Sequence, residues 1–300
     1  MPPIIHTSCP ICGSADTRQV LSVKDHTVSG ELFGINHCNG CQGRFTQNAP
    51  DAASIAGYYK AESYISHTDT REGMVNRLYH LVRRHTLVGK HRLVEKESAQ
   101  KAGRLLDLGC GTGAFLDVMK KAGWEVTGLE PDADARRVAK ERYGIDVSDS
   151  GSLHTLTSGT FDVITLWHVL EHVHDLHSTL DELVRVLKPG GRLFVAVPNF
   201  TSGDAMHYGE YWAAWDVPRH LYHFSPNAMR VLLEKHGLSM YDQRRMWYDS
   251  FYVSLLSEKY KSGRSSLVRA LFEGGLSNAQ ALMNRSSCSS LIYLAVKSKS

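Results

Sequence analysis

Two acids and three glycines form the most chemically informative pattern in this chain. The apolar run that carries Asp107 predicts a buried strand, and Glu130 ends a second apolar run further along. Directly after the first run, glycines stand at alternate positions: Gly109, Gly111 and Gly113. This pattern predicts a tight turn into a helix, with no side chains to keep a ligand from the backbone. The two strand-end acids and the turn between them predict a nucleoside pocket.

The position and charge of these acids indicate which nucleoside. Glu130 lies about 20 residues past the turn, where the nucleotide-binding α/β arrangement places a carboxylate on ribose hydroxyls; alternatively it is a helix N-terminal acid. The glycines and Ala114 also satisfy the G-x-G-x-x-A pattern of dinucleotide enzymes. Asp107 would repel a pyrophosphate but attract an ammonium or sulfonium. It therefore favours S-adenosylmethionine, which carries both cations and no phosphate, although it could instead cap the following helix.

Further motifs follow in order along the chain. The run 161–172 resembles the fourth strand, and the turn after it, of class I S-adenosylmethionine-dependent methyltransferases. Residues 187–193 resemble the turn before the fifth strand, which continues through 194–198. The resemblance covers about residues 85 to 300. It implies an α/β fold with a seven-stranded Rossmann-like sheet whose last strand is antiparallel, and S-adenosylmethionine as the methyl donor.

The resemblance also assigns cofactor contacts. Asp107 and the three glycines would hold the amino acid end, and Glu130 the ribose hydroxyls. Pro131 would flank the adenine, together with Asp132 and the segment 150–153, which ends in Leu153. Trp167 and His168 would lie beside the methionine part.

Two cysteine pairs near the N-terminus have the spacing of metal ligands. Each pair has the C-x-x-C form, and 25 residues separate the pairs: Cys9, Cys12, Cys38 and Cys41. In a reducing compartment such pairs predict a tetrahedral zinc site, with a redox pair or unrelated thiols as the alternative. Four thiolates close the coordination shell, so this zinc is predicted to be structural. Glycines at 13, 40 and 43 would supply the backbone freedom that the two turns need.

Composition limits the remaining classes. The chain has 300 residues, 42% of them hydrophobic and 22% charged, which is typical of a soluble globular protein. The net charge of +3 is too small to argue for a nucleic-acid partner. No apolar run approaches the roughly 20 residues that span a membrane, and no secretory signal is visible, so the cytoplasm is the expected location. The sequence makes no prediction of oligomeric state.

The alternation of predicted elements divides the chain into three parts. We expect a zinc ribbon over 1–47, a helical linker or lid over 48–101, and a methyltransferase domain over 102–300, with a substrate cap at about 199–285. Helices are predicted at 113–122, 132–143, 175–187 and 226–236, and late strands at 238–247 and 290–297.

Histidines are the candidate general bases, because histidine titrates near neutrality. Four lie on loops expected to face the acceptor: His168, His172, His220 and His223. His172 could instead simply pack or form a hydrogen bond. His172 stands four residues after His168, which would put both on one face of a short helix.

The sequence thus predicts methyl transfer to a small-molecule or glycan-precursor acceptor, on oxygen and with a histidine base. Three alternatives remain. The ribbon also resembles that of deoxysugar C-methyltransferases, but only His220 matches their Tyr-His-Glu-His signature. An RNA methyltransferase would fit the ribbon but not the weak charge. A non-catalytic zinc-ribbon binding protein would have no physical need for two pocket acids.

Overall fold

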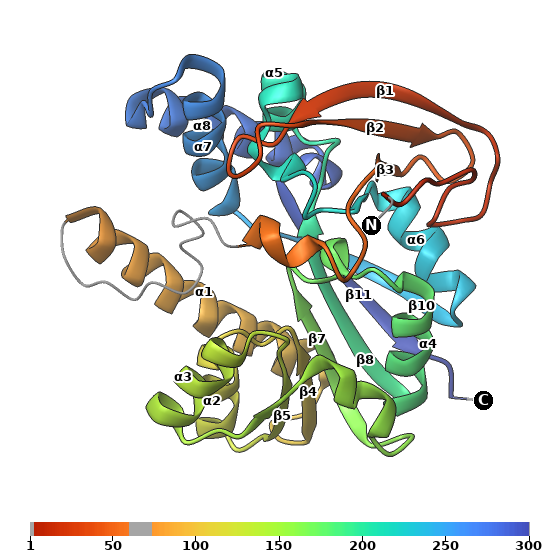
Figure 1. Cartoon of the computed structure of the whole chain (residues 1–300). Coiled ribbons are helices and arrows are strands. Elements are labelled where there is room, and N and C mark those ends of the chain that lie inside the picture. Colours follow the sequence, from red (N-terminus) through yellow and green to blue (C-terminus); the bar gives the residue numbers. More distant parts are fainter. Residues whose placement is uncertain (1–2, 60–73, 300) are drawn as a thin grey trace.

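The structure is a computed structural model that describes residues 3–59 and 74–299, and of residues 74–84 only the backbone (Figure 1). Part of the predicted linker, residues 60–73, therefore lies outside the described residues. The molecule consists of a central seven-stranded sheet with helices on both faces, a small antiparallel sheet at one end, and a group of helices beside it.

The central sheet has the order β10-β11-β8-β7-β4-β5-β6. Its strands are β4 (Arg104–Leu108), β5 (Glu125–Leu129), β6 (Val147–Ser148), β7 (Phe161–Trp167), β8 (Leu187–Pro198), β10 (Leu238–Arg245) and β11 (Ser290–Lys297). All neighbours from β8 to β6 pair in parallel, whereas β11 is antiparallel to both β8 and β10. The predicted seven-stranded sheet with an antiparallel last strand is confirmed. The predicted turn at 187–193 instead falls within the bounds of β8.

The strands are apolar because both faces of the sheet are covered. Successive side chains point to opposite faces, so the neighbours Leu105 and Leu106 enter different cores. Leu105 packs with residues of α1 and α2, and Leu106 with residues of α4 and α6. The helices are α1 (Met74–Ser98), α2 (Ala114–Lys121), α3 (Ala133–Tyr143), α4 (Leu176–Val186), α5 (Gly203–Tyr208), α6 (Pro226–Lys235), α7 (Asp249–Ser262) and α8 (Leu267–Met283).

The four helices predicted from the sequence are confirmed as α2, α3, α4 and α6. Their starts follow local chemistry: Asp132 accepts hydrogen bonds from two backbone N–H groups of α3, and Ser225 caps α6 before Pro226. None of the helices in the described part of the chain combines the length and apolar character needed to span a bilayer.

The small sheet has the order β1-β2-β3-β9. Its first three strands belong to the N-terminal ribbon: β1 (Thr17–Lys24), β2 (Leu32–Cys38) and β3 (Arg44–Gln47). The fourth, β9 (Tyr222–His223), comes from the middle of the methyltransferase-like region and pairs antiparallel with β3. The ribbon is therefore joined to the larger domain by sheet hydrogen bonds, beyond the upper end of β7 in Figure 1.

Helices α5, α7 and α8 form the group beside the sheet and cover much of the predicted cap region. Asp204 of α5, which is 1% exposed, joins α5 to α8 and to the segments that carry Trp212 and Ser289. Its carboxylate accepts hydrogen bonds from Trp212 Nε1 at 2.8 Å and from the Ser277 and Ser289 hydroxyls, both at 2.7 Å. A buried carboxylate needs such donors to offset its desolvation.

Replacing this carboxylate should destabilise the whole cap. Asp204→Ala leaves three buried donors without their acceptor, so we expect the free energy of unfolding to fall by about 3 kcal/mol or more. Urea denaturation followed by circular dichroism measures the loss. Asp146→Ala, which removes an exposed acid, should change stability by less than about 0.5 kcal/mol. Equal stability of the two variants would contradict this account of the cap.

Candidate functional site

Asp107 lies inside β4 at the edge of the glycine turn and is 1% exposed. Its Oδ1 accepts a hydrogen bond from the Thr165 hydroxyl of the neighbouring strand β7, at 2.6 Å. Burial raises the pKa of Asp107 to about 7, against the lowering effects of Thr165 and the nearby Lys90 ammonium. This carboxyl group is therefore poorly solvated and poised to gain from a cation beside it.

Glu130 follows β5 and connects two turns at the same edge of the sheet. Its Oε2 accepts from the Gly111 backbone N–H at 2.8 Å, and its Oε1 from the Asp132 backbone N–H at 3.1 Å. A carboxylate has roughly four acceptor sites, so Glu130 keeps capacity for additional donors. The structure thus brings the predicted pair of acids to adjacent strand ends, with the glycine turn between them.

The glycine turn is shaped by two different constraints. At Gly109, with φ +69°, a Cβ atom would lie 2.4 Å from Cγ2 of Val169, so no other residue fits. At Gly111, with φ +55°, a Cβ would meet nothing within 4 Å. The backbone of Gly111 therefore borders open space, and Gly113 begins α2. This arrangement leaves the turn accessible to a ligand.

The other predicted cofactor residues surround this edge. Leu153 lies in the 3₁₀ helix η2 (Ser150–Thr155) and is buried, whereas Pro131 is exposed at the start of α3. Trp167 ends β7 and packs edge-to-face on Phe115. The Lys90 ammonium lies 4.3 Å from the centroid of the Trp167 ring. The apolar and charged groups around the turn therefore come from α1, β7 and η2.

His168 is held between two acids. Its backbone has φ +59°, and it precedes the 3₁₀ helix η3 (Leu170–His172). Its Nδ1 lies 3.3 Å from Glu171 Oε1 and its Nε2 lies 3.1 Å from Asp249 Oδ2. Burial alone would lower its pKa, but the Asp249 and Glu171 hydrogen bonds outweigh burial and raise the pKa to about 9. His168 is therefore a cation at neutral pH.

His172 points to a different set of partners, so the predicted helical face shared by His168 and His172 is wrong. The left-handed backbone at His168 breaks the helical spacing before η3 begins. The His172 ring packs edge-to-face against His220, with ring centroids 4.6 Å apart. Burial, followed by the neighbouring His220, lowers the pKa of His172 to about 4, so its imidazole is neutral.

His223 lies on β9 and is buried against the ribbon. Its Nε2 is 3.0 Å from the Thr46 hydroxyl, which itself donates to the His220 carbonyl at 2.6 Å. Burial, followed by the nearby His220 and Arg44, lowers its pKa well below the usual range. Of the predicted bases other than His172, His220 is the one whose ring packs against His172.

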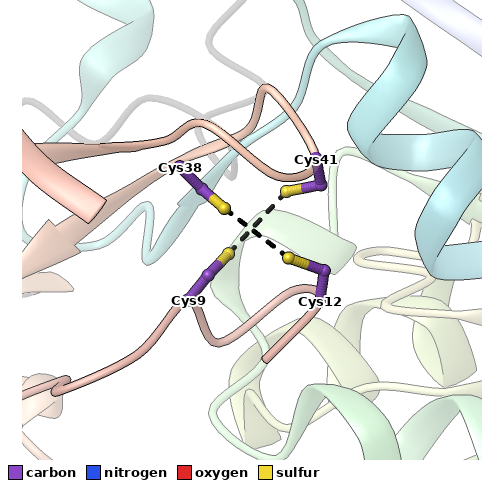
Figure 2. Close-up of side chains that lie close together, drawn as sticks. All are labelled: Cys9, Cys12, Cys38 and Cys41. Atoms are coloured by element: carbon purple, nitrogen blue, oxygen red, sulfur yellow. Dashed lines mark hydrogen bonds between the residues drawn. The ribbon is translucent and has the colours of Figure 1, made fainter. Parts of the chain in front are cut away.

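The four predicted metal ligands converge at one end of the ribbon (Figure 2). Cys9 Sγ lies 3.7 Å from Cys41 Sγ, and Cys12 Sγ lies 3.5 Å from Cys38 Sγ. All four thiols are free, since these separations are far longer than the roughly 2.05 Å of a disulfide. A tetrahedral zinc site with bonds of about 2.3 Å has sulfur–sulfur edges of roughly 3.8 Å. The cluster therefore has the donor type and dimensions of a zinc site.

The two C-x-x-C turns repeat one backbone design. In each turn, the carbonyl of the first cysteine accepts from the residue four positions on, Gly13 after Cys9 and Gln42 after Cys38. These residues have positive φ, +85° and +62°. The second turn thus uses Gln42 where a glycine was expected. Gly43 serves close packing instead, because a Cβ there would lie 2.7 Å from the Ile11 side chain.

Backbone hydrogen bonds connect the ribbon to the two edge-to-face histidines, His172 and His220, which we call the histidine pair. The Thr46 N–H donates to the Leu221 carbonyl at 2.9 Å, and the Leu221 N–H donates to the Glu171 carbonyl at 2.7 Å. The segment that carries His220 is thus fixed between the ribbon and η3.

Sequence reasoning missed Glu171 and Asp249 as site residues. Glu171 had a local signal, because it is adjacent to His172 at a predicted strand end. Asp249 had none, since it lies 81 positions from His168 and starts a helix on another part of the chain.

A family profile described as a methyltransferase domain matches residues 80–243, more than half of the chain. The chain belongs to the class I S-adenosylmethionine-dependent methyltransferases. The matched segment of this methyltransferase contains the acid–glycine–acid site and the histidine pair, and excludes the ribbon.

Curated relatives of this methyltransferase share about half of its length. It is 30% identical over 161 residues to the ubiquinone biosynthesis O-methyltransferase of Xanthomonas oryzae pv. oryzae, a match that covers 49% of this chain and 66% of that protein. It is 29% identical over 165 residues to the mitochondrial ubiquinone biosynthesis O-methyltransferase of Homo sapiens, covering 49% of this chain and 44% of that protein. The chain therefore spans less than two thirds of the length of these relatives.

A solved structure has the same fold. The structure of a candidate sarcosine dimethylglycine methyltransferase from Galdieria sulphuraria superposes with a TM-score of 0.51 at 18% identity, covering 75% of this chain and 88% of that chain. At this identity the likeness shows the methyltransferase fold alone.

Proposed function

We propose that this protein transfers the methyl group of S-adenosylmethionine to an oxygen of a small-molecule or glycan-precursor acceptor. The observation that carries the proposal is the poorly solvated Asp107 carboxyl group beside an open glycine turn, in a chain of this family. The curated relatives are ubiquinone biosynthesis O-methyltransferases, and this supports oxygen as the acceptor atom. They favour it over the alternatives of sugar C-methylation, RNA methylation and non-catalytic binding.

The residues present fit the cofactor. Asp107 would neutralise the ammonium group, while the backbone of Gly109, Gly111 and Gly113 approaches the amino acid end. The spare acceptor capacity of Glu130 suits the two ribose hydroxyls. Pro131 and Leu153 would flank the adenine, and Trp167 the methionine part. The cofactor supplies an activated methyl group, so the protein must align donor and acceptor and remove a proton from the acceptor.

We propose that the acceptor loses its proton beside the pair His172 and His220. His168 is held as a cation by Glu171 and Asp249, and a cation cannot accept a proton. His223 is buried against Thr46 of the ribbon. The His220 ring is held neither between two acids nor against Thr46, and it packs edge-to-face on His172.

We also propose that the four cysteines hold one structural zinc ion, as four thiolates leave no open coordination position. Six free thiols fit a reducing compartment, and we place the protein in the cytoplasm on that ground. The acceptor is best sought by a radiolabelled methyl-transfer screen against phenolic metabolites and sugar nucleotides. Transfer to a carbon or to RNA, with none to oxygen, would overturn the proposed acceptor class.

Cofactor affinity should depend on the protonation of Asp107. With a pKa of about 7 in the free protein, the group is a carboxylate above pH 7 and neutral below it, so S-adenosylhomocysteine should bind progressively more weakly as pH falls below 7. Asp107→Asn should weaken binding at pH 8 by about 1–3 kcal/mol and lose the pH dependence. Calorimetric titration measures both, and Asp134→Asn is the exposed control. Tight binding of NAD would reverse the cofactor assignment.

Turnover should depend on His220 separately from cofactor affinity. His220→Asn should lower the turnover number by about 10²–10⁴ with S-adenosylhomocysteine affinity nearly unchanged, because the proton step is lost and the cofactor edge is intact. Single-turnover kinetics on the identified acceptor measure the effect. His154→Asn, at an exposed position, is the control. Near wild-type turnover of His220→Asn would show that this edge does not handle the proton.

Zinc should be present in protein purified without added metal, at about one ion per chain. Cys9→Ser should lose the ion and leave S-adenosylhomocysteine affinity mostly intact. It should still impair turnover, because β3 holds the segment that carries His220. Elemental analysis and binding measurements test this, with the buried Cys288→Ser as control. A wild-type protein without zinc would contradict the assignment.

A further inference from the structure

We propose that Glu171, His172 and His220 form a second metal site, which binds a divalent transition-metal ion and presents it to an oxygen of the methyl acceptor. The metal site itself stands on geometry alone. The role toward the acceptor rests on the proposed function.

The three side chains offer one ligand atom each, and these atoms all lie within 4.8 Å of one another. Nitrogen and oxygen donors about 2.0–2.2 Å from a metal lie roughly 3–3.5 Å from each other. Small side-chain adjustments therefore close the set around one ion. The ligands come from η3 and from the segment before β9, two parts of the chain that the Leu221 N–H bond to the Glu171 carbonyl holds together.

Both imidazoles are oriented as metal ligands. His172 Nδ1 lies 3.1 Å from the Arg219 carbonyl, and His220 Nδ1 lies 2.9 Å from the Ala214 carbonyl. His172 Nδ1 also lies 3.0 Å from the Tyr59 hydroxyl, which can accept from the same N–H. A carbonyl only accepts, so each Nδ1 that bonds one carries the proton and each Nε2 keeps its lone pair. Backbone carbonyls fix the tautomer of metal-bound histidines in the same way.

Glu171 supplies an uncompensated negative charge. Its side chain is 1% exposed, and its Oε1 lies beside His168. Its Oε2 is buried and has no hydrogen-bond partner among the described residues. Burying a carboxylate oxygen without a donor is costly, and a bound cation would satisfy it. His168 and Asp249 then form the outer shell that orients this carboxylate.

A metal-free histidine base accounts for the cluster less well. A protonated His220 would donate from Nε2, and the nearest acid, Asp216, is 3.7 Å away and already receives the Arg219 guanidinium. One ligand atom from each of the three side chains lies within 4.8 Å of the others, and no donor among the described residues reaches Glu171 Oε2. A cation resolves this arrangement, whereas a third proton acceptor does not.

Two imidazoles and one carboxylate suit zinc, manganese, iron(II) or cobalt(II), and three protein ligands leave positions open. A hydroxyl bound to such an ion loses its proton at lower pH, as zinc-bound water does near pH 7. The proton passes to solvent, the oxygen forms its bond to the methyl carbon, and the carbon–sulfur bond breaks to leave S-adenosylhomocysteine. The acceptor class is therefore a small molecule whose reacting hydroxyl can coordinate a metal, such as a phenol with a neighbouring oxygen.

The test uses the full chain with its cysteine cluster already filled by zinc. Cobalt(II) is added, and the bound ions are counted by equilibrium dialysis and followed by visible absorption without thiolate bands. We expect one cobalt per chain in the wild type. Glu171→Gln and His220→Asn should each weaken binding at least tenfold. The control is His177→Gln, which alters the contact between His177 of α4 and His236 just after α6; this variant should bind cobalt as the wild type does.

Two outcomes overturn the site. One is that the wild type binds no cobalt beyond the cysteine cluster. The other is that Glu171→Gln and His220→Asn bind cobalt as tightly as the wild type does. If a variant fails to fold, which thermal melts reveal, the number of cobalt ions bound per wild-type chain still tests the site. Methyl transfer without any cobalt site would refute this inference and leave the proposed function intact. A cobalt site in a protein that binds no S-adenosylhomocysteine would support the metal site and refute the proposed function.

Discussion

The structure depends on one short stretch of backbone, residues 220–223, that hydrogen-bonds on both sides. On one side β3 of the ribbon pairs with β9, and Thr46 bonds both the Leu221 and the His220 carbonyls. On the other side the Leu221 N–H bonds the Glu171 carbonyl of η3. Because peptide groups are fixed at both edges, the His220 side chain has a defined place relative to Glu171. The ribbon is thus part of the framework of the histidine pair.

Electrostatics divides the carboxyl edge of the sheet into two regions. Around the glycine turn lie two acids, Asp107 and Glu130, and burial raises the pKa of Asp107 to about 7. Past the end of β7, acids and histidines alternate: Asp249, His168, Glu171 and His172. The first region is suited to the cation of a methyl donor. The second can hold charge of either sign in fixed positions, as the chemistry of an acceptor oxygen requires.

The sequence predicted what local rules control. The acid–glycine–acid pattern needs only two neighbouring strands and a turn, and the order of helices and strands follows from apolar periodicity and caps such as Asp132. The sequence-based predictions failed where a single backbone angle, or a partner distant in sequence, determines the position of a side chain. The left-handed φ of His168 separated it from His172, and Gln42 took the positive φ expected of a glycine. Glu171 became a candidate site residue only because the fold brings it near His220 and Asp249. No spacing within a helix or strand predicts such a long-range contact.

The pairing of β3 with β9 has a consequence for how the chain is made. Thr46 and His220 are 174 positions apart, and closing a flexible loop of that length costs about 4–5 kcal/mol beyond a constant. During synthesis β3 is exposed as an unpaired edge strand long before β9 leaves the ribosome. The four cysteines, all within residues 9–41, can close a compact unit in that interval if metal is at hand. Scarcity of zinc would then affect the nascent chain first, because an incomplete ribbon could aggregate through the unpaired edge of β3.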